Sequence, residues 1–240
     1  MSPNRHERDS LDKTAISVIV PVYNESANIG AFLEHLLPIK NHCEIIIVDG
    51  GSGDNTAAQV QQKGFFVTRS PEKGRANQMN HGAALAGGDI LWFLHADSIP
   101  PADPLSKIRS ALAKGYDIGC FPIRFDSRHP LMFIFSFLSN NLRARLFNIA
   151  FGDQGIFLRK TLFTKLGGYA TIPLMEDYKL SLDARAAGCR LALAKGKITT
   201  SARRYCKYGM LKTMWLMQGL QRRFCRGDDI EEIARAYDAR

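Results

Sequence analysis

The sequence lacks the two features that would place a protein in or across a membrane. None of its apolar runs approaches the roughly 18 residues that a membrane-spanning helix needs. Its first twelve residues, MSPNRHERDSLD, are polar and contain no apolar core of the kind found in signal peptides. We therefore expect a cytoplasmic protein with a flexible N-terminal segment over residues 1–14.

Paired cysteines are also missing. The five cysteines are odd in number, widely scattered and never arranged as Cys-x-x-Cys. They are Cys43, Cys120, Cys189, Cys206 and Cys225. This pattern argues against a zinc site or a disulfide framework and indicates reduced thiols.

Two common phosphate-binding loops are absent. A dinucleotide-binding fingerprint needs G-x-G-x-x-G after the first strand and an acidic residue about twenty residues later. Here the glycine-rich stretch GGSGDNT follows the second predicted strand, and the acidic residue, Asp49, precedes it. No G-x-x-x-x-G-K-[ST] loop occurs either. Neither a typical NAD enzyme nor a P-loop nucleotidase is supported.

Acidic residues are missing from one long basic segment. The formal net charge is +9, and residues 195–226 contain nine Lys or Arg and no Asp or Glu. This segment predicts an anionic partner such as a diphosphate, an acidic lipid surface or nucleic acid. The alternative is a basic face that is merely solvated.

Alternating apolar runs and helical stretches predict an α/β fold. Buried strands are expected at residues 15–20, 43–48, 65–68 and 90–94, with helices ending near residue 37 and spanning 56–63 and 74–86. Such units form right-handed crossovers and a doubly wound, mostly parallel sheet flanked by helices. Less regular patterns predict helices at 104–114, 131–151 and 175–187, strands at 118–125, 155–158 and 191–194, and basic helices at the end.

The fourth predicted strand runs directly into polar residues. Residues 90–94 are all apolar, and His95 and Asp97 follow before Pro100 and Pro101. Because side chains alternate along an extended chain, His95 and Asp97 should point to one side at the carboxyl edge of the sheet, where such folds hold ligands. The alternative is an Asp that caps the next turn beside a hydrogen-bonded His.

Two other positions offer carboxylates. Asp49 ends the second predicted strand, so it should converge on the same crevice as Asp97, and it can accept hydrogen bonds from a base or a ribose or simply stabilise its own turn. Asp177 lies in line with the apolar stripe at the start of the predicted helix 175–187, whereas Glu176 lies further round. An inward-facing acid there is a candidate general base, and complementing the helix dipole is its alternative role.

Taken together, the motifs resemble those of glycosyltransferase family 2, whose members are inverting enzymes of the GT-A fold that use nucleotide sugars. The matching segments are VIVPVYNE (18–25), IIIVDGGSGDNT (45–56), KGRANQMNHG (73–82), GDILWFLHAD (88–97), GDQGIFLRK (152–160) and MED (175–177). The resemblance spans about residues 16–193, and the combination of motifs is specific although each motif alone is weak.

The resemblance implies roles for individual residues. The nucleoside would be held by Pro21, Tyr23, Glu25 and Asp49, and the acceptor side would include Gly152, Asp153, Gln154 and Glu176. Asp97, with His95, would bind Mn²⁺ or Mg²⁺ on the diphosphate, and Asp177 would deprotonate the acceptor hydroxyl. Arg75, and Arg203 or Arg204, could add positive charge for the diphosphate. UDP is the favoured nucleotide, with GDP behind it.

Two departures from the family pattern carry consequences. The family usually has Asp-x-Asp where this chain has His95-Ala96-Asp97, and an imidazole brings no negative charge, which favours Mn²⁺ slightly. The Gln-x-x-Arg-Trp motif of processive members is absent. We therefore expect an enzyme that adds a single sugar.

An uncharged run at residues 130–142, PLMFIFSFLSNNL, is too short to span a membrane. It predicts a buried helix, a dimer contact, an acceptor pocket or an interfacial patch that works with the basic C-terminal part. In the last case residues 130–145 and 195–226 would contact the inner face of the membrane, and a lipid-linked or hydrophobic acceptor becomes attractive.

The predicted organisation is a GT-A-like domain over residues 15–194 and a basic helical extension over 195–240. A sugar-nucleotide nucleotidyltransferase is the nearest rival, but it would carry a glycine-rich basic loop after the first strand, and PVYNESAN is no such loop. A non-catalytic nucleotide sensor and a basic nucleic-acid-binding protein are further alternatives. The chain shows no recognisable DNA- or RNA-binding motif, so no nucleic-acid partner is expected.

Overall fold

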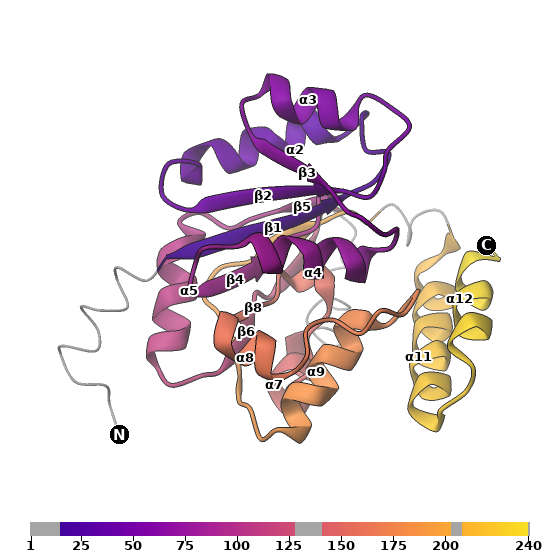
Figure 1. Ribbon diagram of the computed structural model, residues 1–240. Coiled ribbons are helices and arrows are strands. Elements are labelled where there is room, and N and C mark those ends of the chain that lie inside the picture. Colours follow the sequence, from indigo (N-terminus) through magenta and orange to yellow (C-terminus); the bar gives the residue numbers. More distant parts are fainter. Residues whose placement is uncertain (1–14, 128–140, 203–207, 240) are drawn as a thin grey trace.

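The computed structural model describes residues 15–127, 141–202 and 208–239 (Figure 1). The segment predicted to be flexible, residues 1–14, lies outside the described residues, as does most of the apolar run at 130–142. Within the described parts the chain forms a central twisted sheet with helices on both faces and a pair of helices at one side (Figure 1).

In the described residues, the main sheet has seven strands in the order β3-β2-β1-β4-β8-β6-β9. Their bounds are β1 (Ile16–Val22), β2 (Glu44–Asp49), β3 (Phe66–Arg69), β4 (Ile90–Phe93), β6 (Ile118–Cys120), β8 (Phe157–Arg159) and β9 (Leu191–Leu193). The first four strands pair in parallel, as predicted. Strand β8 runs antiparallel to both β4 and β6, so the sheet is mixed but mostly parallel.

Alternation of apolar side chains along the inner strands explains why both faces of this sheet are covered. In β1, for example, Val18 and Val20 belong to one apolar cluster and Ile19 to the other. The first cluster includes residues of α2 (Ile29–Leu36), α3 (Thr56–Gln62) and α5 (Pro104–Ala113). The second includes residues of α4 (Arg75–Leu85), α7 (Leu142–Phe147), α8 (Lys160–Lys165) and α9 (Glu176–Ala186). A short 3-10 helix, η1 (Leu37–Ile39), follows α2.

A second, three-stranded sheet was not predicted. It consists of β5 (Ser98–Ile99), β10 (Ile198–Thr200) and β7 (Ile123–Phe125), in the order β5-β10-β7. The prediction of one strand over 118–125 was wrong, because Phe121 and Pro122 separate β6 in the large sheet from β7 in the small one. Residues 198–200 were expected to be helical and instead pair with β5 and β7.

Other boundaries also differ from the prediction. The helix expected over 131–151 ends at Phe147 in its described part, since Asn148 adopts a left-handed conformation (φ 54°) that stops it. Pro21 was expected to end the first strand, but the strand continues to Val22 with Pro21 paired opposite Val48. The four cysteines that the structure describes are all free, as predicted from their spacing.

The C-terminal helices α11 (Met210–Arg226) and α12 (Ile230–Asp238) form a hairpin beside the domain (Figure 1). Gly227 ends α11 with φ 83°, and the Asp229 carboxylate caps α12 by accepting from the backbone N–H groups of Glu231 and Glu232. The hairpin shares an apolar cluster with the start of α9. In the described residues, no helix is long and apolar enough to cross a membrane.

Candidate active site

A pocket of about 520 Å³ opens at the carboxyl ends of β1, β2 and β4. It is lined by Pro21, Val22, Tyr23, Glu25, Gly50, Lys73, Gly74, Arg75, Gln78, His95, Ala96 and Asp97. Strand order reverses between β1 and β4, so the pocket lies at the switch point where open α/β sheets hold ligands. Of the described residues predicted to hold the nucleotide sugar, all but Asp49 line the pocket, and Arg203 and Arg204 lie outside the described residues.

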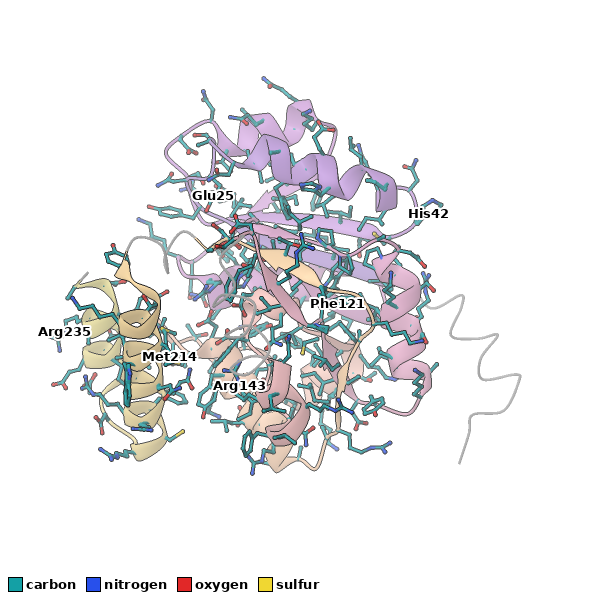
Figure 2. All side chains as sticks on the ribbon, turned by 180° about the vertical axis from the view of Figure 1, so that it is seen from behind. Glu25, His42, Phe121, Arg143, Met214 and Arg235 are labelled. Carbon is teal, nitrogen blue, oxygen red and sulfur yellow. The ribbon has the colours of Figure 1, made fainter. Side chains whose placement is uncertain are left out.

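Two loops at the rim of the pocket are joined by hydrogen bonds between them. Asn24, at φ 52°, donates its N–H to Ser52 Oγ, and its own Oδ1 accepts from Gly53 N–H at 2.9 Å. Glu25 N–H donates to Thr56 Oγ1 at 2.8 Å, which fixes the loop that carries Tyr23 and Glu25. Figure 2 shows Glu25 at this edge of the sheet. The rim is therefore built before any ligand arrives.

Asp49 ends β2 and is buried. Its carboxylate accepts hydrogen bonds from the N–H groups of Gly51 and Ser52, each at 3.0 Å, and from the Ser52 hydroxyl. These bonds shape the turn after β2, which is the structural alternative weighed for this residue. A role in holding the nucleoside remains a prediction.

Gln78 was not predicted as part of the site. Its buried side chain donates from Nε2 to the carbonyl groups of Val22 and Val48, both at 2.8 Å, and so ties the ends of β1 and β2 together. Nothing in the sequence distinguishes such a buried glutamine from one on the exposed face of a helix. Lys73 and Gly74, which precede α4 and line the pocket, belong to the motif that carries Arg75.

His95 and Asp97 follow β4 in a turn closed by a hydrogen bond from Ser98 N–H to the His95 carbonyl. We expected both side chains to point the same way because the chain would be extended there. That reason was wrong, since the chain turns at Ala96. Both residues nevertheless line the pocket. Burial lowers the pKa of His95 to about 4, helped by the charge of Arg75, so the imidazole is neutral near pH 7. Asp97 is exposed toward the solvent.

Arg75 and Glu176 are the first residues of α4 and α9, and their side chains form an ion pair from Nε to Oε1. The Glu176 side chain is only 2% exposed, whereas that of Arg75 is 43% exposed and lines the pocket. Burial raises the pKa of Glu176, the neighbouring Asp177 raises it further, and Arg75 opposes both. Glu176 was expected further from the buried face than Asp177, but it is the more buried of the two.

Asp177 is held by two backbone groups. Its Oδ2 accepts from Gly152 N–H and its Oδ1 accepts from Tyr178 N–H, both at 2.6 Å. Gly152 opens the short 3-10 helix η3 (Gly152–Gln154) and separates Asp177 from His95. A methyl group added at Gly152 would lie 2.5 Å from His95 Cε1 and 3.3 Å from Asp177 Oδ2. The candidate base Asp177 is thus separated from His95 on the pocket wall by Gly152 alone.

The other two residues of η3 differ in character. Gln154 is fully buried, accepts from Phe151 N–H at 3.1 Å and donates to the Phe121 carbonyl, so its side chain is occupied by backbone groups. Asp153 has a buried Oδ1 without a hydrogen-bond partner. Burial raises the pKa of Asp153 to about 7, Asp177 adds to the rise, and Arg143 opposes it.

The residues predicted to bind a divalent metal, His95 and Asp97, supply two of the ligands that such a metal needs. Among the described residues, no cluster of three or more His, Cys, Asp or Glu is arranged to hold a metal. Asp97 offers an oxygen ligand and neutral His95 a nitrogen ligand on the same pocket wall. Such a pair suits a metal whose other ligands come from a bound diphosphate and water.

The fold and the pocket define an α/β protein with a ligand site at the switch point of a mostly parallel sheet. The chain belongs to the family described as glycosyl transferase family 2, whose model matches residues 17–166. This finding confirms the resemblance seen in the motifs.

Relatives and solved structures agree with this assignment. The chain is 33% identical over 116 residues to an undecaprenyl-phosphate 4-deoxy-4-formamido-L-arabinose transferase of Serratia proteamaculans, a match that covers 43% of this chain and 35% of that protein. The matches to this and other curated relatives cover 30 to 50% of each relative's length. The chain therefore spans half or less of the length of these relatives.

The structural likeness extends over most of the chain. The mannosyltransferase PcManGT of Pyrobaculum calidifontis, in complex with GDP-Man and Mn²⁺, gives a TM-score of 0.64 at 18% identity, covering 90% of this chain and 67% of that one. Glucosyl-3-phosphoglycerate synthase of Mycobacterium tuberculosis, in complex with Mn²⁺, UDP and glucosyl-3-phosphoglycerate, gives 0.56 at 18% identity, covering 81% and 73%. At this identity the likeness establishes the shared GT-A-like fold.

Proposed function

We propose that the protein is an inverting, metal-dependent glycosyltransferase that moves one sugar from a nucleoside-diphosphate sugar to an acceptor hydroxyl. The observation that carries the proposal is the junction at Gly152, where the backbone N–H holds Asp177 and the Cα hydrogens face His95 on the pocket wall. A base on one side of this junction and a nucleotide pocket on the other suit direct displacement at the anomeric carbon.

The pocket residues divide between the two halves of the donor. Pro21, Tyr23 and Glu25, on or beside the rim loops, are proposed to contact the nucleoside, and Asp49 supports them by shaping the second loop. Lys73 and Arg75 bring positive charge to the wall on which the diphosphate would lie. Helix α4 starts beside them without a side-chain cap, so its first N–H groups add to the anion-binding character of this wall.

Asp97 and His95 are proposed to hold Mn²⁺ or Mg²⁺ against the diphosphate. The ion would supply positive charge to the departing nucleoside diphosphate. His95 is neutral near pH 7 and can therefore act as a ligand without first losing a proton. Arg75 adds a fixed positive charge, which remains in place because Glu176 holds the guanidinium.

Asp177 is proposed to take the proton of the attacking hydroxyl. Its two hydrogen bonds from backbone N–H groups fix the orientation of the carboxylate that would accept the proton. A single displacement with one base inverts the anomeric centre. Because the chain lacks the motif of processive members, transfer of one sugar is the favoured outcome.

For the nucleotide we favour UDP over GDP, and for the acceptor a lipid-linked or hydrophobic molecule. The support for the acceptor is twofold: relatives named as undecaprenyl-phosphate transferases, and exposed apolar side chains beside basic ones. Leu146 and Phe147 are 62% and 54% exposed on α7, and Trp215 is 65% exposed on the basic helix α11. These side chains suit peripheral contact with an anionic membrane.

The decisive experiment is calorimetric titration with UDP, GDP, dTDP and CDP, with and without Mn²⁺, for the wild type and Asp97→Ala. We expect one nucleotide to bind in a metal-dependent way and Asp97→Ala to lose that dependence. Release of nucleoside diphosphate from the matching sugar nucleotide, abolished in Asp177→Asn, then separates an enzyme from a nucleotide sensor. A folded protein that binds none of the four would refute the proposal.

A further inference from the structure

Four side chains from four different segments form a continuous stack next to the candidate base. The Arg143 guanidinium lies over the Phe151 ring at 3.7 Å, Phe151 contacts Tyr178 with ring centroids 5.8 Å apart, and the Tyr178 and Phe224 centroids are 5.9 Å apart. These residues come from α7, the segment before η3, α9 and α11. Figure 2 shows Arg143 on the side of the domain that faces the C-terminal helices, which carry Met214 and Arg235.

The central pair of this stack flanks the hydrogen bond that holds the base. Phe151 directly precedes Gly152, and Tyr178 directly follows Asp177. The Gly152 N–H to Asp177 contact is therefore bracketed by the contact between the Phe151 and Tyr178 rings. A shift of the backbone at either ring would therefore act directly on the 2.6 Å hydrogen bond.

The C-terminal hairpin packs against Tyr178, next to the candidate base. Tyr178 contacts α11 through Phe224 and through a hydrogen bond of 3.3 Å between its hydroxyl and Cys225 Sγ. The buried members of the apolar cluster that the hairpin shares with the domain are Ile149, Leu174, Met175, Tyr178, Leu220 and Ile233. Met175, just before Glu176, adopts φ 68°, which is unfavourable for a side chain other than glycine and persists only where packing enforces it.

We propose that Phe151, Tyr178 and Phe224 are positioning residues for Asp177, and that the α11–α12 hairpin is thereby a working part of the acceptor side of the site. The inference deepens the proposed function and rests on it for the role of Asp177. The geometric part, that the hairpin holds the Gly152 to Asp177 hydrogen bond through this stack, does not depend on that role and is argued from the contacts between these residues.

The test compares Phe224→Leu and Tyr178→Leu with a matched control, Ile233→Ala. Ile233 is fully buried in the same apolar cluster but lies on α12 and takes no part in the stack. The first measurement is the amide proton shift of Gly152 in ¹⁵N-labelled protein, which reports the short hydrogen bond to a carboxylate without requiring activity. The second is the maximal rate at which the enzyme hydrolyses the sugar nucleotide, with water as the acceptor. The affinity for the nucleotide in the presence of Mn²⁺ is measured alongside it.

We expect Phe224→Leu and Tyr178→Leu to move the Gly152 amide signal upfield and to lower the maximal hydrolysis rate about tenfold or more, since small displacements of a reacting group are costly. Nucleotide affinity should stay within about twofold in every variant, because the donor pocket lies elsewhere. Ile233→Ala should lower stability while leaving the Gly152 signal and the rate close to wild type.

An unchanged Gly152 signal in both stack variants, or equal effects in Ile233→Ala, would overturn the inference. A wild-type protein that hydrolyses no sugar nucleotide would instead count against the proposed function, and the amide signal would still decide whether the hairpin positions Asp177. Phe224 is only partly buried, so Phe224→Leu keeps the test open even if Tyr178→Leu fails to fold.

Discussion

The Arg75 guanidinium and the Glu176 carboxylate join the first residue of α4 to the first residue of α9. One partner lines the pocket and the other is buried beside Asp177. The ion pair therefore connects the wall proposed for the diphosphate with the residue proposed as the base. Its two ends lie 101 residues apart in the chain, so sequence spacing gave no sign of it.

Removing one partner of this ion pair should cost more stability than removing both. In Arg75→Met the Glu176 carboxylate stays buried without its cation, so we expect a loss of about 1–3 kcal/mol in the free energy of unfolding. The double variant with Glu176→Gln should recover most of that loss but not the affinity for the nucleoside diphosphate. Urea unfolding and calorimetry measure the two quantities. Equal stability of the single and double variants would contradict this account.

Gly152→Ala and Gly82→Ala should separate catalysis from packing. The first places a methyl group 2.5 Å from His95 Cε1, and we expect it to lower the hydrolysis rate about 100-fold by displacing His95 or the Asp177 contact. The second places a methyl group 2.5 Å from Ile19 Cγ2 in the core and should cost about 1–3 kcal/mol of stability while leaving the rate unchanged. Similar rates for the two variants would argue against the Gly152 junction.

Asp153 should make the stability of the protein fall as the pH rises. Its pKa in the folded protein is raised from 3.8 to about 7, so between these values the folded state holds a proton that the unfolded state has lost. The stabilising effect is complete below pH 4 and is lost as the pH passes 7. At pH 8 the free energy of unfolding of Asp153→Asn, measured with urea, should therefore exceed that of the wild type by about 1–3 kcal/mol. At pH 4 the two proteins should differ little. The same difference at both pH values would disprove the assignment.

His95→Asp should change the choice of metal. A nitrogen ligand favours Mn²⁺ over Mg²⁺, whereas two carboxylates suit Mg²⁺ better. We expect the wild type to bind the nucleotide more tightly with Mn²⁺ than with Mg²⁺, and the variant to narrow or reverse that preference. Calorimetry with each metal measures it without any turnover. An unaltered ratio of the two affinities would remove His95 from the metal site.

Membrane contact should depend on the exposed apolar side chains of α7 and α11. We expect Leu146→Ser with Phe147→Ser, and separately Trp215→Ser, to weaken sedimentation with vesicles of anionic phospholipid several-fold at low salt. Phe66→Ser is the control, because Phe66 is 58% exposed on β3 at the far edge of the sheet. If the wild type fails to sediment, or the control loses as much binding, the contact is not made by these helices.

The parts of the fold that the sequence predicted well are those with a strong local pattern. Runs such as residues 45–48 in β2 are apolar on both faces, so strand type and parallel pairing followed directly. The small sheet could not be predicted, because strands of two or three residues such as Ser98–Ile99 have no periodicity to detect. Their pairing depends on segments about a hundred residues apart in the chain.

The same distinction applies to the site. Residues at strand ends, such as Asp97, could be placed on the pocket wall from the order of the strands alone. Contacts between side chain and backbone could not, because the bonds of Gln78 to Val22 and Val48 and of Gly152 to Asp177 depend on how distant elements meet. The departure of His95 from the family pattern was visible in the sequence, but its partial burial was not.

The antiparallel pairing of β8 with β4 marks a boundary between an earlier and a later part of the chain within the main sheet. The pocket residues come from positions 21–97, whereas Asp177, its stack and the C-terminal hairpin come from positions 143–238. Recombination between β4 and α7 would exchange the later half and keep the residues that line the pocket, provided that the new half again supplies a partner for Arg75. Descendants of one ancestral chain could in this way keep a donor while acquiring new acceptors.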